Sequence, residues 1–295
     1  MAGQADLLCQ TPRDRFASIV KGAALKAAQL TTDGQEPVKP PLKWAGGKRW
    51  QVQHIEGLWK PESHRRLVEP FAGGLAVALG LLPRKALLND INPHLINLYR
   101  WLKRGLVIEG KFEHSEKAYY RARKRFNELL SQDKHNTAEA AGLFYYLNRT
   151  GYNGLCRFNL SGGFNVPFGR HPQIAYRYEF SEYVRAFKNW EFSNVHFSKL
   201  KLNADDFVYA DPPYDVEFTK YSKDGFSWDD QLAAAKWLSK HPGPVILSNQ
   251  ATERVMKEYK RLGFHLRTLD APRKISCTGD RSPAVEVLAI RNLPV

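Results

Sequence analysis

Residues 66–90 read RLVEPFAGGLAVALGLLPRKALLND, and this stretch decides the fold. A short apolar strand at 66–71 runs into three small residues at 72–74. Helix-like residues follow at 75–82, and a second apolar strand occupies 86–90. A strand, a glycine turn, a helix and another strand are typical of a βαβ unit, whose two strands lie parallel in one sheet.

The rest of the chain supplies further strands and helices of the same kind. Apolar runs typical of buried strands occur at 206–211, 245–249 and 285–291, and helical patterns occur at 229–240 and 251–262. The sequence therefore predicts an α/β fold with a doubly wound, mostly parallel, Rossmann-like sheet.

Residues 96–193 differ from this pattern. Their first half is rich in Arg, Lys, Tyr, Leu and Glu at helical spacing, and the later part is rich in Gly, Asn and aromatic residues. We expect an inserted, mostly helical domain here, between the two parts of the sheet domain at 41–95 and 194–295. Residues 1–40 read as an N-terminal extension with a stiff, proline-rich linker, and an amphipathic helix is predicted over 15–30.

The chain of 295 residues carries a formal net charge of +14. This charge favours a polyanionic partner such as a nucleic acid, because each Lys or Arg set against a phosphate releases a counterion, although a basic protein without that role has the same charge. The three cysteines lie far apart and form no CxxC pair, so we expect neither disulfides nor a metal site. No apolar run has the length of a membrane span, and no secretory leader is recognisable, so we expect a cytoplasmic protein. We also expect a monomer.

Asp211-Pro212-Pro213-Tyr214 directly follows the apolar run at 206–211, where an open α/β sheet forms its ligand crevice. Two successive prolines fix φ and make this loop rigid. The loop presents a carboxylate, a carbonyl oxygen and an aromatic ring, which together suit an exocyclic amine on a flat base. Asp211 and the Pro212 carbonyl would accept hydrogen bonds from the amine as it attacks a methyl sulfonium, while Tyr214 would stack on the base. The alternative is a plain strand-ending turn.

Two other segments suit a small ligand. The glycines of EPFAGG at 69–74 would let the backbone approach a ligand at the start of a helix, although a tight turn without a ligand has the same sequence. Asp90 ends the second strand, where a carboxylate can accept hydrogen bonds from ribose hydroxyls or cap the next helix. In KWAGGK at 43–48, Trp44 offers a ring face and the lysines suit a carboxylate or phosphate; a surface turn is the alternative. The chain has no GxGxxG pattern and no GxxxxGK[ST] phosphate loop.

Residues 147–170 combine arginines and asparagines with aromatic residues and glycines, as DNA readout requires. Arg157 can fork onto guanine, and Asn153 can pair with base edges or fill a vacated place in the base stack. The other candidate contacts are Arg149 and Arg170 for phosphates, and Leu155 and Pro167 for a thymine methyl group. The alternative is a loop folded on its own aromatic core, which we expect for several residues, such as Phe158, Phe164 and Phe168.

These four segments, in this order, resemble the Dam family of DNA adenine-N6 methyltransferases, in the α group of amino-methyltransferases. The similarity covers nearly all of residues 42–292. Later stretches that also match are 218–221 with Phe226, Ser248-Asn249, and 273–276 before Arg281 and Glu286. The resemblance implies a Rossmann-like S-adenosylmethionine-dependent catalytic domain at 41–95 and 194–295 and a target-recognition domain at 96–193. It further implies methyl transfer to a flipped-out adenine in double-stranded DNA, with GATC as the first choice of target.

The resemblance also implies roles by position. The residues around the methionine end of the cofactor would be Trp44, Ala45, Gly46 and Lys48, and those flanking its sugar and adenine would be Phe71, Gly73 and Asp90. The residues that hold the flipped adenine would be Asp211, which also borders the cofactor, Pro212 and Tyr214. The positions that read the target are Lys43, Tyr152, Asn153, Leu155, Arg157 and Pro167. This chain departs from the family in three stretches. Residues 1–40 have no counterpart, and residues 195–199 align poorly, although Phe197 is a candidate adenine contact. Residues 161–163 also differ, which implies an altered preference for the bases that flank the target.

Several alternatives stay open on sequence grounds. The alternative enzyme activities are methylation of cytosine N4, of RNA adenine or of a protein glutamine amide. Enzymes of the last kind usually have the motif Asn-Pro-Pro-Tyr, whereas this chain has Asp211 at the first position. C5-cytosine chemistry needs a cysteine nucleophile and no Pro-Cys pair exists, so we expect a structural role for Cys156. A DNA-binding protein without transferase activity is the alternative from another class. A nucleotide-dependent dehydrogenase or ATPase would need the phosphate loops that the chain lacks.

Overall fold

The computed structural model describes residues 38–214, 226–272 and 284–294. These residues belong to one compact unit that begins at Val38. The amphipathic helix expected at 15–30 lies outside the described residues, as do Cys9 and Cys277.

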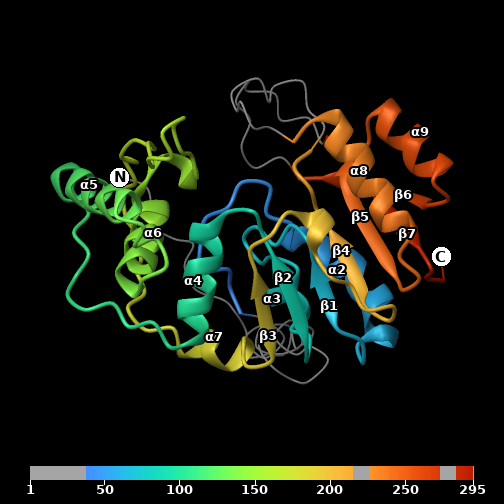
Figure 1. Cartoon of the computed structure of the whole chain (residues 1–295), viewed down its shortest axis with the longest axis horizontal. Coiled ribbons are helices and arrows are strands. Elements are labelled where there is room, and N and C mark those ends of the chain that lie inside the picture. The colour runs from blue at the N-terminus through green and yellow to red at the C-terminus, as the bar shows by residue number, and fades with distance from the viewer. Residues whose placement is uncertain (1–37, 215–225, 273–283, 295) are drawn as a thin grey trace, which may run out of the picture. The chain divides into compact units, whose positions relative to one another are not determined.

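A seven-stranded sheet with the order β3-β2-β1-β4-β5-β7-β6 forms the centre of this unit (Figure 1). The strands are β1 (Leu67–Glu69), β2 (Ala86–Asn89), β3 (Trp190–Ser193), β4 (Phe207–Ala210), β5 (Val245–Gln250), β6 (His265–Ala271) and β7 (Ala284–Arg291). The five neighbouring strands β3, β2, β1, β4 and β5 pair in parallel. Strand β7 pairs antiparallel with both β5 and β6. The strand order reverses between β1 and β4, so the predicted doubly wound, mostly parallel sheet is confirmed.

Helices flank the sheet along the described chain. They are α2 (Val52–Trp59), α3 (Ala78–Leu81), α4 (Pro93–Lys103), α5 (Glu116–Ser131), α6 (Ala138–Thr150), α7 (Ser181–Ala186), α8 (Trp228–Ser239) and α9 (Glu253–Arg261), with short 3-10 helices η1 (Arg49–Gln51), η2 (Lys60–Glu62), η3 (Tyr152–Gly154) and η4 (Phe197–Lys199). The predicted helices at 229–240 and 251–262 are confirmed as α8 and α9. The helix predicted at 75–82 is shorter, because Leu75 adopts a positive φ of 60° and continues the turn.

Alternate residues of the strands point to opposite faces of the sheet, as the period of two requires. Leu67 of β1 and Phe207 of β4 belong to a core cluster shared with α2, α3 and α4. Val68 and Val208, one residue further along the same strands, belong to a second cluster with α8 and α9. The strands β1, β2 and β4 are buried along their whole length, which explains why their sequences are continuous apolar runs.

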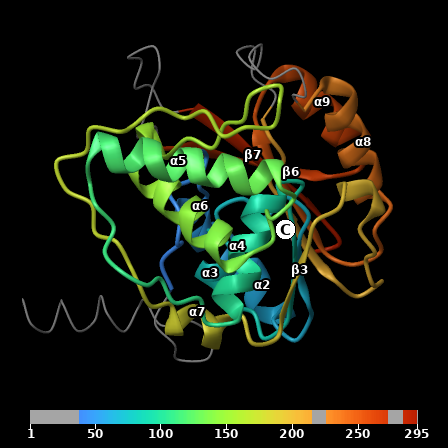
Figure 2. The ribbon, with the colours of Figure 1, turned by 60° about the vertical axis from the view of Figure 1, so that its left-hand side comes forward.

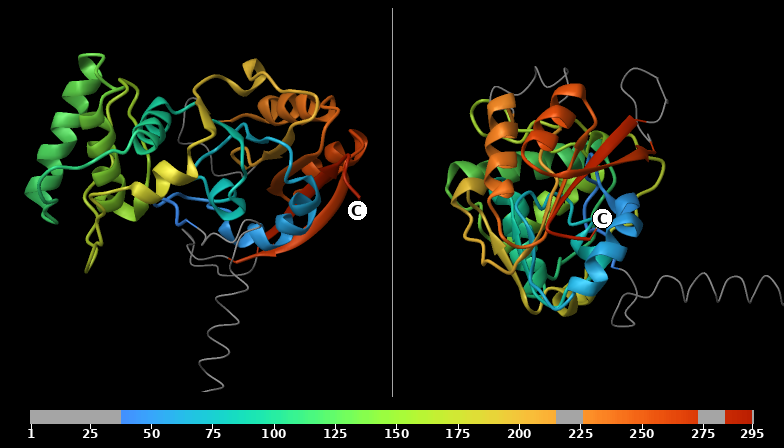
Figure 3. Two further views of the ribbon diagram at one scale, coloured as in Figure 1. Left: turned by 90° about the horizontal axis from the view of Figure 1, so that it is seen from below. Right: turned by 90° about the vertical axis from the view of Figure 1, so that its right-hand side faces the viewer.

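The inserted segment places α5 and α6 beside α4, to one side of the sheet (Figures 2 and 3). Its edges differ from the expected boundaries. Helix α4 runs without interruption across residue 95, and β3 pairs with β2 although it precedes residue 194. Neither β3 nor β6 was predicted as a strand. Both lie at the edges of the sheet and are partly exposed, so their sequences lack a continuous apolar run.

The segment after α6 folds over the inserted helices as an irregular hairpin. Isolated bridges join Gly151 to Phe168 and Phe158 to Phe164. Phe164 is buried against Phe126 of α5, and Phe158 stacks on His94 with ring centroids 4.8 Å apart. Phe158 and Phe164 also contact each other, with ring centroids 5.4 Å apart. These aromatic residues are therefore packed inside as expected, but in a core that the loop shares with α4 and α5.

Candidate active site

A cavity of about 790 Å³ opens at the carboxyl ends of β1, β2 and β4. All residues expected to hold the cofactor or perform the chemistry line it, namely Trp44, Ala45, Gly46, Lys48, Phe71, Gly73, Asp90, Asp211, Pro212 and Tyr214. Phe197 lines it as well. None of the residues expected to read DNA does so. The structure therefore separates the two sets of residues that the sequence suggested.

The glycine turn and the KWAGGK segment form one wall, because they pack directly on each other. A Cβ atom on Gly74 would lie 2.7 Å from Cβ of Trp44, and one on Gly73 would lie 2.8 Å from Nε1 of the same ring. Gly73 also has a φ of +45°, which side chains rarely adopt. The small residues thus leave space for Trp44 to lie against the turn.

Asp90 fixes the other side of the turn. Its Oδ2 accepts a hydrogen bond from the backbone N–H of Gly73 at 2.9 Å, and its Oδ1 accepts one from Asn92 at 2.9 Å. Burial raises the pKa of Asp90, and these two N–H groups partly offset that effect. The N-cap of α4 is Asn92, which accepts from His94 and Leu95, so the alternative of Asp90 as the cap is wrong. Asp90 instead holds a carboxylate at the cavity wall.

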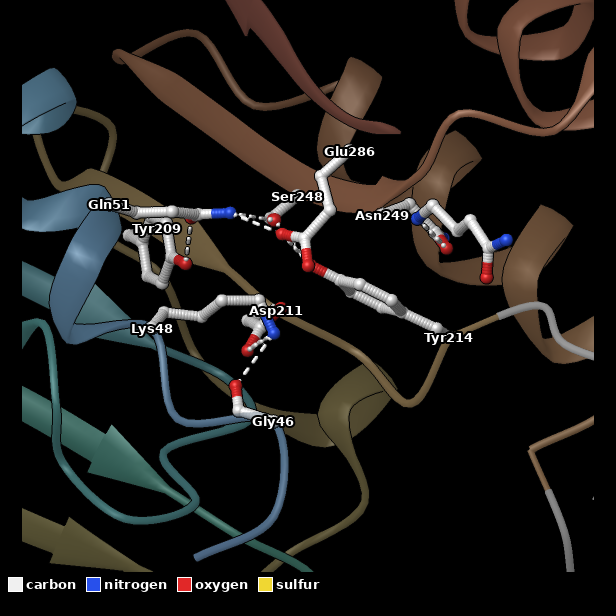
Figure 4. Close-up of polar contacts among 10 residues, drawn as sticks. Gly46, Lys48, Gln51, Tyr209, Asp211, Tyr214, Ser248, Asn249 and Glu286 are labelled. Atoms are coloured by element: carbon white, nitrogen blue, oxygen red, sulfur yellow. Dashed lines mark hydrogen bonds and ion pairs between the residues drawn. The ribbon is translucent and has the colours of Figure 1, made fainter. Parts of the chain in front are cut away.

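Lys48 lies between the side chains of Asp211 and Tyr214. Its Nζ is 3.3 Å from Oδ2 of Asp211, donates a hydrogen bond to the carbonyl of Gly46 at 2.7 Å, and lies 4.3 Å from the ring centre of Tyr214 (Figure 4). Desolvation raises the pKa of Asp211 to about 6, although the charge of Lys48 lowers it. The other oxygen of Asp211, Oδ1, is buried and has no hydrogen-bond partner among the described residues.

The phenol of Tyr214 is held by groups from two distant strands. Its hydroxyl donates to Oε2 of Glu286 on β7 at 2.7 Å and lies 2.9 Å from Oγ of Ser248 on β5 (Figure 4). Gln51 of η1 joins the same two side chains, at 2.7 Å and 3.0 Å, and accepts a hydrogen bond from Tyr209. These side chains form a connected polar network around the hydroxyl of Tyr214.

Aromatic rings line another part of the cavity. The ring of Phe71 lies 5.4 Å from that of Phe197 and 5.5 Å from that of Phe226, between ring centres. These residues come from three separate segments, after β1, in η4 and before α8. They offer an apolar surface that suits a flat heterocycle.

The residues expected to read DNA lie in the hairpin after α6 and in the segment that meets it. Tyr152, Asn153 and Arg157 are exposed, and Asn153 adopts a positive φ of 50°. The backbone N–H of Tyr152 donates to the carbonyl of Pro167, which brings these two residues together. Of the remaining candidates, Pro167 and Arg170 are exposed, whereas Leu155 and Arg149 are partly buried.

Lys43 connects this hairpin with the cavity wall. Its Nζ donates to the carbonyl of Arg149 at 3.1 Å and lies 3.3 Å from Nε2 of His171. Burial and the charge of Arg149 lower the pKa of Lys43. The side chain of Asn148 accepts from the backbone N–H of Lys43 and donates to its carbonyl, at 2.9 Å and 2.8 Å.

Several residues at the site received no role from the sequence. Glu69 lines the cavity, burial raises its pKa well above the usual range, and its Oε1 has no partner among the described residues. Asn148, Gln51, Ser248 and Glu286 are the other additions. Ser248 and Glu286 lie in stretches that match the Dam family, and Asn148 lies in the 147–170 segment, but no role was expected for any of them. The sequence does not reveal that these four polar side chains are buried.

Cys156 is largely buried, and Asn92 donates to its sulfur at 3.4 Å. Burial raises the pKa of its thiol to about 12, so the group is a poor nucleophile, in line with the expected structural role. Within the described ranges, no three His, Cys, Asp or Glu side chains gather as metal ligands would. No helix in these ranges is long and apolar enough to span a membrane.

The sequence profile of the D12 class N6 adenine-specific DNA methyltransferases matches residues 44–275. The chain belongs to this family. It is therefore a DNA adenine-N6 methyltransferase, and the resemblance to the Dam family is confirmed.

Relatives of this D12 class methyltransferase include DNA adenine methylases and a type II methyltransferase. It is 36% identical over 272 residues to the DNA adenine methylase of Escherichia coli strain K12, covering 84% of this chain and 94% of that protein. The retron Ec67 DNA adenine methylase of Escherichia coli is 35% identical over 264 residues, covering 84% of this chain and 90% of that protein. A type II methyltransferase of Lactococcus lactis subsp. cremoris, M1.LlaDCHI, is 35% identical over 248 residues, covering 77% and 87%.

Proposed function

We propose that this methyltransferase transfers the methyl group of S-adenosylmethionine to N6 of an adenine flipped out of duplex DNA, within the sequence GATC, and that it acts in a bacterial or phage-infected cytoplasm. One observation carries the chemistry. Oδ1 of Asp211 is buried at the cavity, ahead of the two prolines and the ring of Tyr214, and no described group donates a hydrogen bond to it. A buried acceptor without a donor is rare unless a ligand supplies one.

The cavity fits S-adenosylmethionine in size and chemistry. Its volume of about 790 Å³ lies within the range of small-molecule sites. Asp90 lies where ribose hydroxyls could donate to it, and the aromatic wall around Phe71 suits a purine. Trp44 and the backbone from Ala45 to Gly47 would border the methionine end, with Lys48 close enough to meet its carboxylate. When bound, S-adenosylmethionine supplies an electrophilic methyl group on a sulfonium.

The chain's own residues would prepare the adenine amine. Its nitrogen is a weak nucleophile, because the lone pair is delocalised into the ring. Asp211 Oδ1 and the Pro212 carbonyl would accept its two hydrogens and stabilise the positive charge that develops on the nitrogen. Tyr214 would stack on the base and hold the nitrogen in line with the methyl group. The raised pKa of Asp211, about 6, leaves its carboxylate ionised at neutral pH and able to accept.

The exposed hairpin supports the proposal of a DNA target. Arg157 presents its guanidinium with Nε and Nη2 held by Asn165 at 2.8 Å and 3.2 Å, and this is the type of side chain that forks onto guanine. Asn153 and Tyr152 are exposed beside it. The assignment of GATC rests on the match of these positions to the Dam pattern.

The experiment that tests the proposal is methyl transfer from labelled S-adenosylmethionine to two short duplexes, one with GATC and one with the site scrambled. We expect incorporation only into the GATC duplex, recovered as N6-methyladenine. Equal incorporation into both duplexes would reject the target sequence while keeping the chemistry. Absence of incorporation with cofactor and DNA binding intact would reject methylation of GATC. It would leave either an enzyme for a different site or an inactive DNA-binding protein, and a library of duplexes would distinguish the two.

A further inference from the structure

We propose that Glu286, with Gln51 and Ser248, is a positioning device that sets the ring plane of Tyr214 for the target base. The inference rests on the proposed stacking of a flipped adenine on that ring. Glu286 lies on β7, Ser248 on β5 and Gln51 on η1. The three side chains therefore connect elements from the beginning and the end of the described chain to the proposed catalytic loop.

The need for such a device follows from the geometry of the loop. Pro212 and Pro213 fix the backbone before Tyr214, but two side-chain torsions of the tyrosine stay free to change. A ring that turns about these torsions would present a different plane to the base. Gln231 of α8 donates to the carbonyl of Pro213, which fixes the backbone from the other side but leaves the ring itself unconstrained.

The polar contacts constrain the ring at its tip. The Tyr214 hydroxyl lies 2.7 Å from Oε2 of Glu286 and 2.9 Å from Oγ of Ser248, so the phenol oxygen has two fixed neighbours. Burial, followed by the carboxylates of Asp211 and Glu286, raises the pKa of Tyr214 far above its usual range. The phenol therefore keeps its proton and remains the donor to Glu286.

Glu286 is in turn held in place. Gln51 donates to the same Oε2 at 2.7 Å and to Ser248 at 3.0 Å, and its own Oε1 accepts from the hydroxyl of Tyr209 at 2.8 Å. Gln51 and Ser248 are fully buried and Glu286 is 8% exposed. A polar network that is buried and connected in this way has one low-energy arrangement, since breaking any contact leaves a buried group unpaired.

One face of the Tyr214 ring meets Lys48, whose Nζ also contacts Asp211. Movement of the ring would therefore disturb the carboxylate that accepts the amine. The network thus couples the ring plane of Tyr214 to the position of the Asp211 carboxylate. Glu286 can have this effect without contacting the substrate.

A double-mutant cycle tests this inference, with Tyr214→Phe, Glu286→Ala and the double variant. We expect each single variant to lower kcat about tenfold, because small misplacements of reacting groups are costly, while KM for S-adenosylmethionine stays within about twofold. If the hydroxyl and the carboxylate act through each other, the double variant falls about tenfold as well; independent effects would multiply to about a hundredfold.

Two further readouts separate a positioning role from an effect on stability alone. The first is kcat, compared with the unfolding midpoint, in two more variants. Glu286→Gln keeps an acceptor oxygen, so it should recover most of kcat. Tyr183→Phe is the matched control, because it removes a buried hydroxyl that donates to the carbonyl of Lys39 away from the cavity. We expect this control to lower the unfolding midpoint without changing kcat.

The second readout is the fluorescence of 2-aminopurine placed at the target adenine, which rises when the base leaves the stack. Tyr214→Phe and Glu286→Ala should bind DNA normally but give a smaller rise than wild type. Wild-type kcat in Tyr214→Phe, or multiplicative effects in the double variant, would overturn the inference. If wild type itself shows no rise, the flipping proposal fails, and the rate cycle alone decides the network.

Discussion

The side-chain amide of Asn148 makes reciprocal hydrogen bonds with the backbone of Lys43, 105 residues earlier in the chain. It also donates to the carbonyl of Gly154 at 3.2 Å. One buried side chain therefore connects the end of α6, the short helix η3 and the first residue of the KWAGGK segment. This links the part of the molecule that would read DNA with the part that would hold the cofactor.

Replacing Asn148 with Ala should destabilise the protein and weaken its discrimination between target and scrambled DNA. The substitution leaves the Lys43 N–H and two carbonyls without their partner, and each unsatisfied buried group costs about 1–3 kcal/mol. Urea unfolding measures the stability, and kcat/KM on the two duplexes measures discrimination. Asn97→Ala is a matched control, because Asn97 is also a buried asparagine, and its side-chain amide donates to the carbonyl of Thr137, away from the hairpin. A loss no larger than that of Asn97→Ala would contradict the linking role.

Replacing Asp211 with Ala should abolish methyl transfer and leave DNA binding largely intact. The variant loses the acceptor that would stabilise charge on the amine, an effect worth on the order of 10²–10³ in kcat or more. Single-turnover rates and a DNA-binding titration measure the two properties separately. Asp205→Ala, at an exposed position just before β4, serves as a control that should keep its rate. Near-normal transfer by Asp211→Ala would reject the proposed chemistry.

The rate should depend on pH through the ionisation of Asp211. Desolvation raises its pKa from 3.8 to about 6, and only the ionised carboxylate accepts from the amine. Since the charged form is lost as pH falls, kcat/KM should decline below about pH 6 and level off above about pH 7. The Lys48 charge lowers this pKa and the Glu286 charge raises it. Lys48→Met should therefore move the acid limb to higher pH, and Glu286→Gln should move it to lower pH. Displacement of both profiles in one direction would rule out Asp211 as the titrating group.

Replacing Gly74 with Ala should weaken the binding of S-adenosylmethionine by about tenfold, which corresponds to about 1.4 kcal/mol of binding free energy. The new Cβ would lie 2.7 Å from Cβ of Trp44, so the tryptophan would have to leave its place in the cavity wall. Calorimetric titration with the cofactor measures the change. Gly57→Ala in α2 is the control, because a Cβ there meets no atom within 4 Å. Equal affinity in Gly74→Ala and wild type would remove Trp44 from the cofactor site.

The sequence predicts the centre of the sheet and the cavity floor well, for a physical reason. Strands β1, β2 and β4 are buried on both faces, so each is a short apolar run that ends at a glycine, acidic or proline-rich turn. The carboxyl ends of parallel strands meet at one edge, so the turns after β1 and β4 necessarily lie together. Asp211 and Gly73 could be placed near each other on these grounds alone.

The network below Tyr214 could not be predicted in the same way. Gln51 and Glu286 meet across 235 residues. Glu286 matches a position of the Dam family, but nothing in the sequence indicates that it contacts Tyr214, and Gln51 stands in no recognisable pattern. Glu286 reaches the site because β7 is inserted antiparallel between β5 and β6, and β6 is a half-exposed edge strand without an apolar run. Contacts that depend on the pairing of such strands become visible only in three dimensions.

Replacing Arg157 with Ala should lower discrimination at one base pair of the target by about 1–3 kcal/mol, the usual value of a fork-like contact to guanine. The guanidinium is exposed, and Asn165 holds its Nε and Nη2, so the side chain is oriented before DNA binds. The measurement is kcat/KM on the GATC duplex and on duplexes with each single base-pair change. Arg125→Ala is the matched control, since Arg125 is an exposed arginine on α5 that pairs with Glu139. Its preference should match wild type. Unchanged preference of Arg157→Ala at every position would remove Arg157 from the readout, whereas loss confined to one position would identify the base pair that it reads.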